Sequence, residues 1–291
     1  MNLLLKTDGN FRSVNNEIFP LHLYEKILNR VGIHYHRIME RRKVVFGFAY
    51  DGTSFSSYQS HNSFNTVEGG IRSEVTSNLL GENMRTASRT DKNVSALFNA
   101  MSLDTTVKPE DTIGILNSNL ENIYFHSYGY VSDDFNVRHC SEKEYTYLLP
   151  FSWVDIDEFI REMKKFIGKH DFAKFCRYDN KETIREINSI DTIFWNGMPG
   201  LVFRARGFLW NQIRFIVGYG IKRQRDGAEP EDPWSDQNWS RYLAPAELLF
   251  LTKIKYEGVD MKRIRSRSME KKIEILKRGT IARNYFFNHI P

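Results

Sequence analysis

The sequence of 291 residues predicts an α+β fold with a largely antiparallel, mixed sheet. Strand-like runs are mixed with stretches of helical periodicity, and the two kinds do not alternate strictly, as they would in parallel βαβ folds. Hydrophobic residues make up 41% of the chain, which is enough to form a sizeable core. A chain of this length is expected to form one large domain or two ordinary ones.

Strands are predicted where β-branched and aromatic residues gather in short runs bounded by turn signals. The predicted strands are residues 43–50, 96–103, 123–131, 143–149, 183–195, 201–206 and 250–256. The first of them runs into Asp51-Gly52-Thr53, and residues 196–200 form a turn between two later ones. Residues 170–175 are expected to form a loop that inserts into the core.

Helices are predicted where apolar residues recur about every four positions and share one face. This spacing is shown by Val67, Ile71, Val75 and Leu79. Their helix starts at Asn65 or Thr66, with Glu68 as the capping-box partner of Asn65, and is expected to end at Gly81. The other predicted helices are residues 21–31, ended by Gly32; 109–120; 155–167, ended by Gly168; 211–225; 236–242; and 259–278, ended by Gly279.

Four segments are predicted along the chain, with Pro150 at the seam between two α+β halves. They are a basic extension (1–42), a first half (43–150), a second half (151–258) and a basic tail (259–291). The extension holds seven Lys/Arg against four Asp/Glu, and the tail holds nine against three. Such ends are typical of arms that bind a polyanion such as RNA, and equally of helical tails whose charge serves solubility.

Several classes of protein do not fit the sequence. No apolar run approaches the roughly 20 residues of a membrane span, and the first residues turn polar too early for a secretory signal. Cys140 and Cys176 lack metal or redox spacing, and two isolated thiols suit a reducing, cytoplasmic location. His34 and His36 have no third metal ligand nearby, so no metal site is expected.

The polar, turn-rich stretch 88–96 is the candidate for chemistry. It lies between an amphipathic helix and an apolar run, and packed elements on both sides can hold a loop residue in place. Its carboxylate, Asp91, has Arg89 two positions away, and a nearby cation favours the ionised, nucleophilic form. Taken alone, Arg-Thr-Asp is a common string, and Asp91 then reads as a solvated turn residue.

A series of short motifs extends this stretch over about residues 43–257. The motifs are Tyr50-Asp51-Gly52-Thr53, Tyr58-Gln59, Thr66-Val67-Glu68, Arg89-Thr90-Asp91-x-x-Val94-Ser95, Leu116-Asn117-x-x-Leu120, Asp133-Asp134-Phe135-x-x-Arg138, Tyr145-x-Tyr147, His170-Asp171-Phe172, Phe208 with Gln212-Ile213-Arg214-Phe215-Ile216-Val217-Gly218, and Ala244-Pro245-Ala246-Glu247-x-Leu249. Each is weak singly, but in their common order the chain resembles the TruA family of tRNA pseudouridine synthases.

The resemblance implies a pseudouridine synthase fold, in which two α+β halves share a continuous sheet around a central basic, RNA-binding cleft. It also implies a homodimer that binds the anticodon arm of tRNA. Family members isomerise uridine to pseudouridine in the anticodon stem-loop, at positions 38, 39 and/or 40, without a cofactor or a metal ion.

Four site residues follow from the resemblance. Asp91 matches the nucleophile, and Arg214 matches the arginine that pairs with it. Tyr145 matches the tyrosine that stacks on the target uracil, and Arg89 matches a residue that holds the flipped-out site open. Without the family, Tyr145 is expected to be an ordinary strand aromatic, and Arg89 a surface residue or a phosphate contact. Arg214 is then a solvated helix arginine, although its apolar neighbours Ile213 and Phe215 favour a buried partner.

Arg204 and Arg206 alternate along a predicted strand, a spacing that suits weak phosphate contacts. The chain also departs from the family at four positions. Asn93 stands in place of a usual Gly, Ser95 of a frequent His, Tyr58 of a frequent Trp, and Leu248 of a Gly. Asn is the next best residue after Gly at a left-handed backbone position, so the turn at Asn93 is expected to survive.

Two alternatives remain open at this point. The first is a non-catalytic RNA-binding protein on the same scaffold, which the intact set of Arg89, Asp91, Tyr145 and Arg214 argues against. The second is an unrelated metal-dependent enzyme built on the histidines, for which the pair His34 and His36 is poor support.

Overall fold

A computed structural model of the chain describes residues 11–14, 17–20, 38–59, 65–180, 182–227, 232–235 and 242–289. Contacts between residues divide the chain into two compact units, residues 1–40 and residues 41–291. In the first unit, β1 (Phe11–Val14) and β2 (Glu17–Pro20) form an antiparallel pair. The predicted helix 21–31 and the histidines at 34 and 36 lie outside the described residues.

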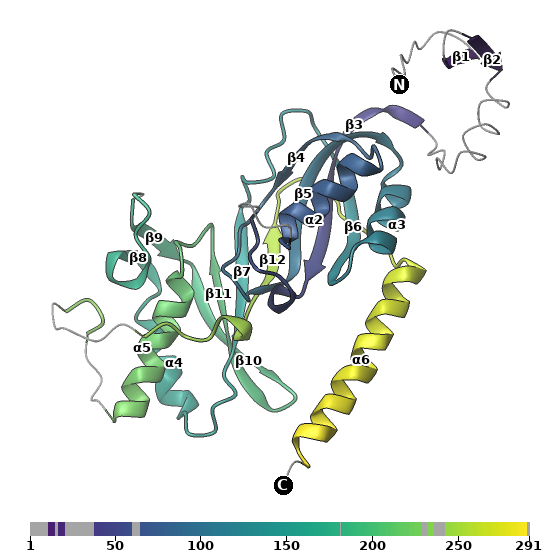
Figure 1. Cartoon of the computed structure of the whole chain (residues 1–291). Helices are drawn as coiled ribbons and strands as arrows, with labels where there is room; N and C mark the ends of the chain where they lie inside the picture. The colour runs from purple at the N-terminus through teal and green to yellow at the C-terminus, as the bar shows by residue number, and fades with distance from the viewer. Residues whose placement is uncertain are drawn as a thin grey trace. The chain divides into compact units, whose positions relative to one another are not determined.

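One sheet runs through the second unit (Figure 1). Its strand order is β10-β11-β7-β12-β5-β3-β6-β13, with β4 paired to β5 on a side branch. The strands are β3 (Ile38–Tyr50), β4 (Glu82–Thr86), β5 (Ser95–Val107), β6 (Ile123–Val131), β7 (Glu142–Leu148), β10 (Ser189–Trp195), β11 (Met198–Ala205), β12 (Leu249–Lys255) and β13 (Lys262–Arg263). A separate antiparallel pair is formed by β8 (Gly168–Asp171) and β9 (Ile184–Ile187).

Early and late parts of the chain interleave in the middle of this sheet. β7 pairs antiparallel with both β11 and β12, and β12 in turn pairs parallel with β5. In the parallel pair, Phe250 and Leu251 lie opposite Ser95 and Ala96, directly after the Asp91 loop. The mostly antiparallel, mixed sheet confirms the predicted α+β class.

The helices pack in two groups. α2 (Val67–Ser77) and α3 (Pro109–Asn119) contact each other, and they also contact β4 and β6 respectively. α4 (Ile156–Lys164) and α5 (Gln212–Asp226) contact each other, and α4 also contacts β10. Short 3-10 turns are η1 (Gly52–Ser54), η2 (Ala173–Phe175) and η3 (Ala246–Leu248). No helix in the described part of the chain is long and apolar enough to cross a membrane.

The start of α2 differs from the predicted capping box. Thr66 is the N-cap residue, because its hydroxyl accepts a hydrogen bond from the Gly69 N–H at 3.1 Å. The Asn65 amide donates instead to the carbonyl of Ser54, so it stays outside the helix. The side chains of both Thr and Asn can accept the N-cap hydrogen bond, which explains why the sequence left both residues open.

The end of α2 also differs from its prediction. The helix stops at Ser77, and Leu79 is 82% exposed in a left-handed conformation with φ of +51°. Leu80, not Leu79, is the buried residue at this point. The chain then passes through Gly81 into β4, for which no range was predicted.

Residues 170–175 enter the core as predicted, although His170 and Asp171 belong to β8. The side chains of Phe172 and Phe175 are fully buried. Both contact the ring of Trp234 edge to face, and His170 stacks on the same ring at 4.3 Å between centroids. The predicted single strand 183–195 is interrupted at Asn188, so it forms β9 and β10.

The C-terminal helix is longer and starts later than predicted. α6 (Arg267–Phe287) follows the two-residue strand β13 and runs through Gly279, which was expected to stop it. A mid-helix glycine costs only about 1 kcal/mol relative to alanine, so it lowers helix stability without ending the helix. Most of the predicted helix 236–242 lies outside the described residues.

Candidate active site

The loop between β4 and β5 holds Asp91 in a tight turn. The Val94 N–H donates to the Asp91 carbonyl at 3.1 Å, and Asn93 has a left-handed φ of +68°, as the sequence predicted. Gly52 of η1 packs against this turn so closely that a Cβ there would lie 2.0 Å from the Val94 carbonyl oxygen. The Gly52 N–H also donates to the Ser95 hydroxyl at 3.0 Å, so Ser95 has a structural task in this chain.

Two hydrogen bonds brace the other side of the loop. The hydroxyls of Tyr50 and Thr90 lie 2.9 Å apart, and the Asn99 amide donates to the Ser88 carbonyl at 2.9 Å. The loop that carries Asp91 is therefore fixed from β3, η1 and β5 together.

Arg214, in the first turn of α5, brings a guanidinium to Asp91. Its Nη1 lies 3.7 Å from the Asp91 Oδ2, and only 13% of the Arg214 side chain and 20% of the Asp91 side chain are exposed. The Arg214 Nε donates to the Ala244 carbonyl at 2.8 Å, and the Ala244 N–H donates to the Arg214 carbonyl at 3.1 Å. These reciprocal bonds hold the guanidinium in one orientation.

α5 and residues 242–244 approach closely because Gly218 has no side chain. A Cβ on Gly218 would lie 1.9 Å from the Tyr242 carbonyl oxygen. The glycine thus allows the contact that clamps Arg214 from behind. This is a close-approach role for Gly218, one turn of helix after Arg214.

Burial dominates the electrostatics of Asp91. Loss of solvation raises the pKa of its carboxyl above the ordinary value, and the Arg214 guanidinium, followed by the Trp210 side chain, opposes that rise. The sequence predicted that cations would hold the carboxylate ionised, and the structure shows that burial is the larger effect. The fixed guanidinium of Arg214 favours the ionised, nucleophilic form of Asp91 against the effect of burial.

A cavity of about 930 Å³ opens in front of Asp91. The cations that line it outnumber the anions, six Lys/Arg against Asp91 and Asp179. These cations are Arg89, Lys92, Arg138, Lys143, Arg177 and Arg214. The cavity is large enough for a nucleotide and attracts a polyanion.

Tyr145 and Phe208 form an aromatic wall of the cavity. Tyr145 lies in β7, is 9% exposed, and meets the Phe208 ring edge to face at 5.3 Å between centroids. Burial raises the pKa of the Tyr145 phenol, so this group stays protonated at neutral pH. Lys143, two residues earlier on the same strand, also lines the cavity, and burial lowers the pKa of its ammonium.

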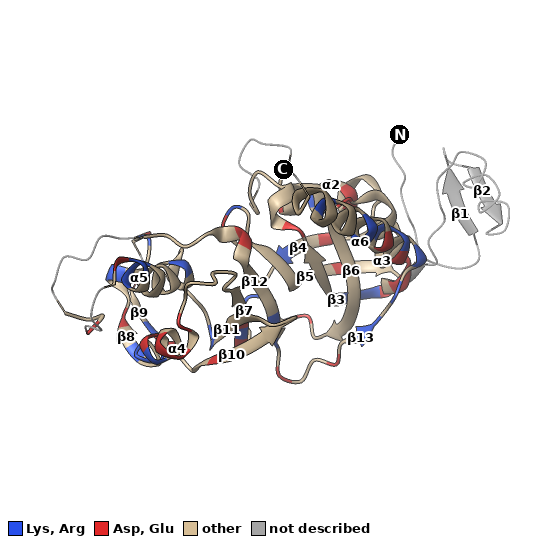
Figure 2. Ribbon diagram, turned by 90° about the horizontal axis from the view of Figure 1, so that it is seen from below, with Lys and Arg blue, Asp and Glu red and all other residues tan. Residues whose placement is uncertain are grey.

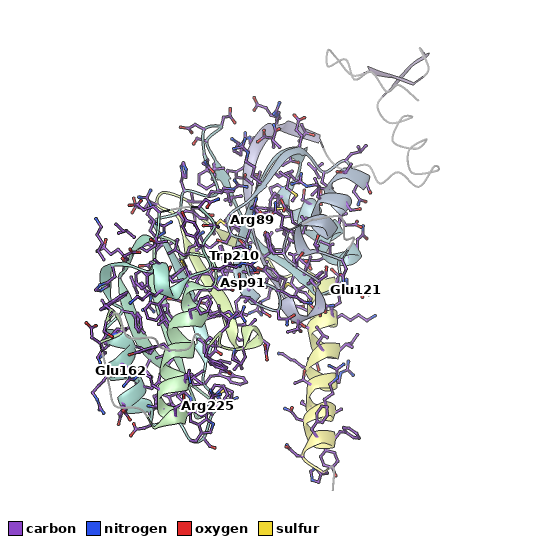
Figure 3. The ribbon with its side chains drawn as sticks, turned by 60° about the vertical axis from the view of Figure 1, so that its left-hand side comes forward. Arg89, Asp91, Glu121, Glu162, Trp210 and Arg225 are labelled. Carbon is purple, nitrogen blue, oxygen red and sulfur yellow. The ribbon has the colours of Figure 1, made fainter. Side chains whose placement is uncertain are left out.

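The structure places Arg89 at the rim of the cavity and not on Asp91. Its side chain is exposed, and the ion pair of Asp91 is made by Arg214. The proximity in sequence predicted the wrong cation for this contact. In Figure 3, Arg89, Asp91 and Trp210 lie together in the middle of the unit, far from Glu162 and Arg225.

Trp210 and Arg177 are site residues that the sequence did not single out. The Arg177 guanidinium lies over the Trp210 ring at 4.1 Å from its centroid, and the Arg177 N–H donates to the Trp210 carbonyl at 2.8 Å. Both line the cavity beside Asp91. The only sequence signal for Trp210 is an aromatic residue directly before the predicted helix 211–225.

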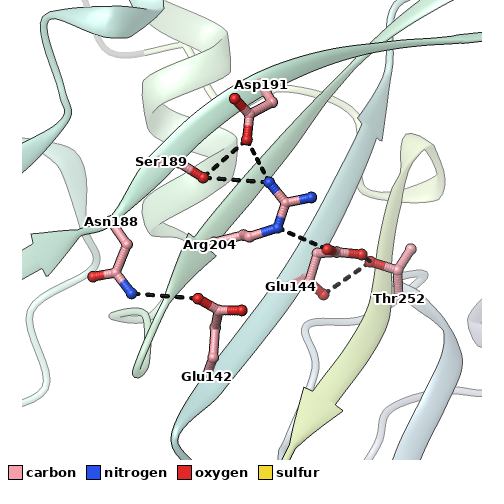
Figure 4. A network of polar contacts seen from close by, with 7 residues as sticks. All are labelled: Glu142, Glu144, Asn188, Ser189, Asp191, Arg204 and Thr252. Carbon is pink, nitrogen blue, oxygen red and sulfur yellow. Dashed lines mark hydrogen bonds and ion pairs between the residues drawn. The ribbon is translucent and has the colours of Figure 1, made fainter.

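Arg204 and Arg206 were both expected to contact phosphates. For Arg204 this expectation is wrong. Its guanidinium is bound to Glu144, with Nε to Oε2 at 2.8 Å, and to Asp191. Figure 4 shows this network, which includes Thr252 and ties together the four neighbouring strands β10, β11, β7 and β12. Neither Arg204 nor the exposed Arg206 lines the cavity.

Among the described residues, no group of three or more His, Cys, Asp or Glu side chains is arranged to hold a metal ion.

A family profile described as tRNA pseudouridine synthase matches residues 163–256. The tRNA pseudouridine synthase A of Thermoplasma acidophilum is 38% identical over 220 residues, which cover 76% of this chain and 86% of the relative. The proteins of the same name from Picrophilus torridus and Pyrococcus horikoshii are 36% and 33% identical, and the matches cover 73% and 79% of this chain and 81% and 90% of the relatives.

Proposed function

The chain belongs to the TruA family of tRNA pseudouridine synthases, which makes it an isomerase that acts on uridine in tRNA, and we propose that Asp91 is its nucleophile. The observation that carries the proposal is the buried ion pair of Asp91 and Arg214 at the wall of a cationic cavity. We further propose that the target uridines lie in the anticodon stem-loop, at positions 38, 39 and/or 40.

The reaction requires a nucleophile, a cation and a surface for the freed base. The bond between uracil N1 and ribose C1′ breaks, the base turns, and a bond between C5 and C1′ forms while C5 loses its proton and N1 gains one. Asp91 attacks either the ribose or the base ring. In the first route the carboxylate leaves C1′ as the C5–C1′ bond forms, and in the second it leaves the base ring after that bond has formed. Arg214 keeps the carboxylate in place and offsets its burial.

The target base has to leave its stack, because the reacting atoms are otherwise out of reach. Flipping costs a few kcal/mol, and stacking on an aromatic ring returns roughly 1–3 kcal/mol. Tyr145 offers such a ring inside the cavity, and Arg89 at the rim is placed to hold the opened RNA apart. The remaining cations of the cavity contact phosphates, so affinity for tRNA falls as salt rises.

The family resemblance also supports a homodimer in which one tRNA contacts both subunits. Sedimentation equilibrium of the whole chain tests this proposal. A mass of twice the 34.3 kDa chain supports it, and a monomer at micromolar concentration contradicts it.

The proposed function is tested on unmodified tRNA transcripts that carry uridines in the anticodon arm. Wild type and Asp91→Ala are incubated with each transcript, and pseudouridine is mapped by chemical labelling. We expect product only with wild type, with and without a chelator, while both proteins bind tRNA. Asp179→Ala, which removes the other carboxylate of the cavity, is expected to form product at the same uridines.

Two results would point elsewhere. If wild type binds tRNA and forms no pseudouridine on any transcript, the chain is a non-catalytic RNA-binding protein. If Asp91→Ala forms product at the wild-type rate, another group is the nucleophile.

A further inference from the structure

Gln212 is a buried amide at the wall of the cavity. It stands in the same motif as Arg214, but the mechanism above gives it no role. It is the first residue of α5, two positions before Arg214, and 1% of it is exposed. Its Oε1 accepts a hydrogen bond from the Leu209 N–H at 2.8 Å. The side chain thus folds back over the start of its own helix, and it lines the cavity together with Asp91.

The bond to Leu209 determines which way the amide points. A backbone N–H needs an acceptor, so the oxygen of Gln212 faces Leu209 and the nitrogen faces away from it. That nitrogen, Nε2, is buried and has no hydrogen-bond partner among the described residues. A buried donor left without an acceptor is costly and rare in folded proteins.

The chemistry of the cavity indicates which acceptor the Gln212 Nε2 donor binds. Nε2 can only donate, and the edges of a flipped-out uracil carry two carbonyl acceptors, O2 and O4. Gln212 shares the first turn of α5 with Arg214, whose guanidinium reaches the nucleophile. Gln212, Arg214 and Asp91 all line this cavity, so a base held for attack by Asp91 lies in the same cavity as the Gln212 side chain.

We propose that Gln212 is a specificity-determining residue that donates from Nε2 to a carbonyl oxygen of the target uracil. The proposal rests on the proposed function, since it places uracil in this cavity. A contact to O4 would also reject cytosine, which has an amino donor at that position and would face donor with donor. A contact to O2 would position the base without excluding cytosine.

Gln212→Met tests the donor, and Gln224→Met is the matched control. Gln224 lies on the same helix, donates from Nε2 to the Asp155 carbonyl at 2.8 Å, and likewise has one amide atom without a partner, but it lies away from the cavity. We expect Gln212→Met to lower kcat/KM for pseudouridine formation about tenfold to a hundredfold. Gln224→Met is expected to match wild type.

Gln212→Glu separates the donor from the fold of the loop. An ionised Glu side chain keeps an acceptor for the Leu209 N–H and removes the donor. At a pH where this carboxyl is ionised, we expect the variant to lose activity as Gln212→Met does. We also expect it to unfold at a lower temperature than wild type, because a carboxylate at this buried position loses its solvation. Activity at the wild-type level in Gln212→Glu would overturn the proposal.

Thio-substituted RNA identifies the carbonyl and excludes a merely structural role. Stem-loop RNAs carry uridine, 4-thiouridine or 2-thiouridine at the target, since sulfur accepts hydrogen bonds more weakly than oxygen. Binding is measured in the Asp91→Ala background, with and without Gln212→Met, as a double-mutant cycle. We expect one thio substitution to weaken binding by several-fold with Gln212 and to have no effect without it.

If both thio effects are the same with and without Gln212, the amide does not touch a carbonyl and the proposal is wrong. The binding cycle gives this answer whether or not wild type forms pseudouridine. If wild type forms no pseudouridine but one thio substitution weakens binding only when Gln212 is present, the proposed function alone is contradicted.

Discussion

The helices α5 and α6 both carry many Lys and Arg residues, coloured blue in Figure 2, yet they are packed in opposite ways. α5 buries much of its length, from Gln212 to Ile221, and its first turn faces the cavity. α6 is longer, but Met269 is its only buried residue and residues 274–289 are all exposed. Figure 1 shows α6 leaving the sheet next to α3.

In the part of the chain that the structure describes, the side-chain hydrogen bonds that join α6 to other elements lie at its start. The Lys272 ammonium donates to the carbonyls of Asn117, Ser118 and Leu120 at 2.8–3.2 Å, at the C-terminal end of α3. The Ser266 hydroxyl accepts from the Asn117 amide at 2.9 Å. Beyond these contacts the helix presents exposed cations and apolar side chains, which are Ile275, Leu276, Lys277, Arg278, Ile281, Arg283, Tyr285, Phe286 and Phe287.

This difference shows that buried and exposed cations have different roles. A desolvated guanidinium such as that of Arg214 acts on a single carboxylate, and its effect depends on geometry. Solvated cations on α6 are screened by salt, and they contribute to RNA affinity by releasing counterions. We therefore expect changes in α5 to alter the chemical step, and changes in the exposed part of α6 to alter binding.

The largest effect is expected from Arg214→Met. Loss of the fixed cation leaves Asp91 buried and unpaired, so kcat/KM should fall roughly 100-fold or more. Arg214 lowers the pKa of Asp91, so its removal raises that pKa and moves the rising limb of the pH–rate profile to higher pH. Arg225→Met, on the same helix but far from Asp91 in Figure 3, is the control. An unchanged profile in Arg214→Met would remove Arg214 from the mechanism.

The next effect concerns the exposed part of α6. Deletion of residues 277–291 removes Lys277, Arg278 and Arg283, and should weaken tRNA binding about tenfold. The slope of log affinity against log salt should become less negative by about two. A cut after Leu276 is used because a cut at Val259 would also remove β13 and the contact of Lys272 with α3.

A charge-only variant sharpens this test. Lys277→Gln, Arg278→Gln and Arg283→Gln together keep the helix and should reproduce the change in salt slope. If the deletion leaves both the affinity and the slope unchanged, α6 does not contact tRNA.

A smaller effect is expected from Lys272→Met at the anchored start of α6. Three carbonyls at the end of α3 lose their donor, so the free energy of unfolding should fall by about 1–2 kcal/mol. Lys271→Met, one position earlier and exposed, should change it by less than about 0.5 kcal/mol. Equal losses in urea titrations of the two variants would show that the anchor contributes nothing specific.

The smallest effect is expected in the stability of Asp91→Asn. The folded state raises the pKa of Asp91, so its contribution to stability is present below the unfolded pKa, about 3.9, and is lost as pH rises through the folded pKa. Asn stays neutral at every pH. Thermal unfolding should therefore show Asp91→Asn more stable than wild type at pH 7 and equal to it near pH 4. A less stable Asp91→Asn at pH 7 would mean that the ion pair outweighs burial.

Local pattern in the sequence was sufficient for much of the fold. The strand 123–131 has the predicted bounds, because apolar alternation and turn signals at both ends act locally. The end of the last helix was not predictable from Gly279, since packing and capping outweigh a single residue's propensity. β4 was missed because only its pairing with β5 makes that short run a strand.

Site residues that belong to a family motif could be predicted from the sequence. Contacts between segments that are distant in the sequence could not. Asp91, Tyr145 and Arg214 lie in one cavity, as the family resemblance led us to expect. The partners of Arg204 depend on the register of β11 with β7 and β10, which no local spacing reveals. The free donor of Gln212 depends in the same way on a backbone N–H and a cavity that only the folded chain brings together.

The central claim is that α5 acts in the chemical step and the exposed part of α6 acts in binding. It is tested most directly by the single-turnover rate of pseudouridine formation with saturating enzyme. Wild type, Arg214→Met and the chain cut after Leu276 are compared on the same tRNA transcript, at an enzyme concentration that saturates each protein. We predict that Arg214→Met lowers the saturated rate roughly 100-fold, whereas the truncated chain reaches the wild-type rate. A truncated chain that binds all the tRNA but reacts as slowly as Arg214→Met would contradict the account, because α6 would then take part in the chemical step.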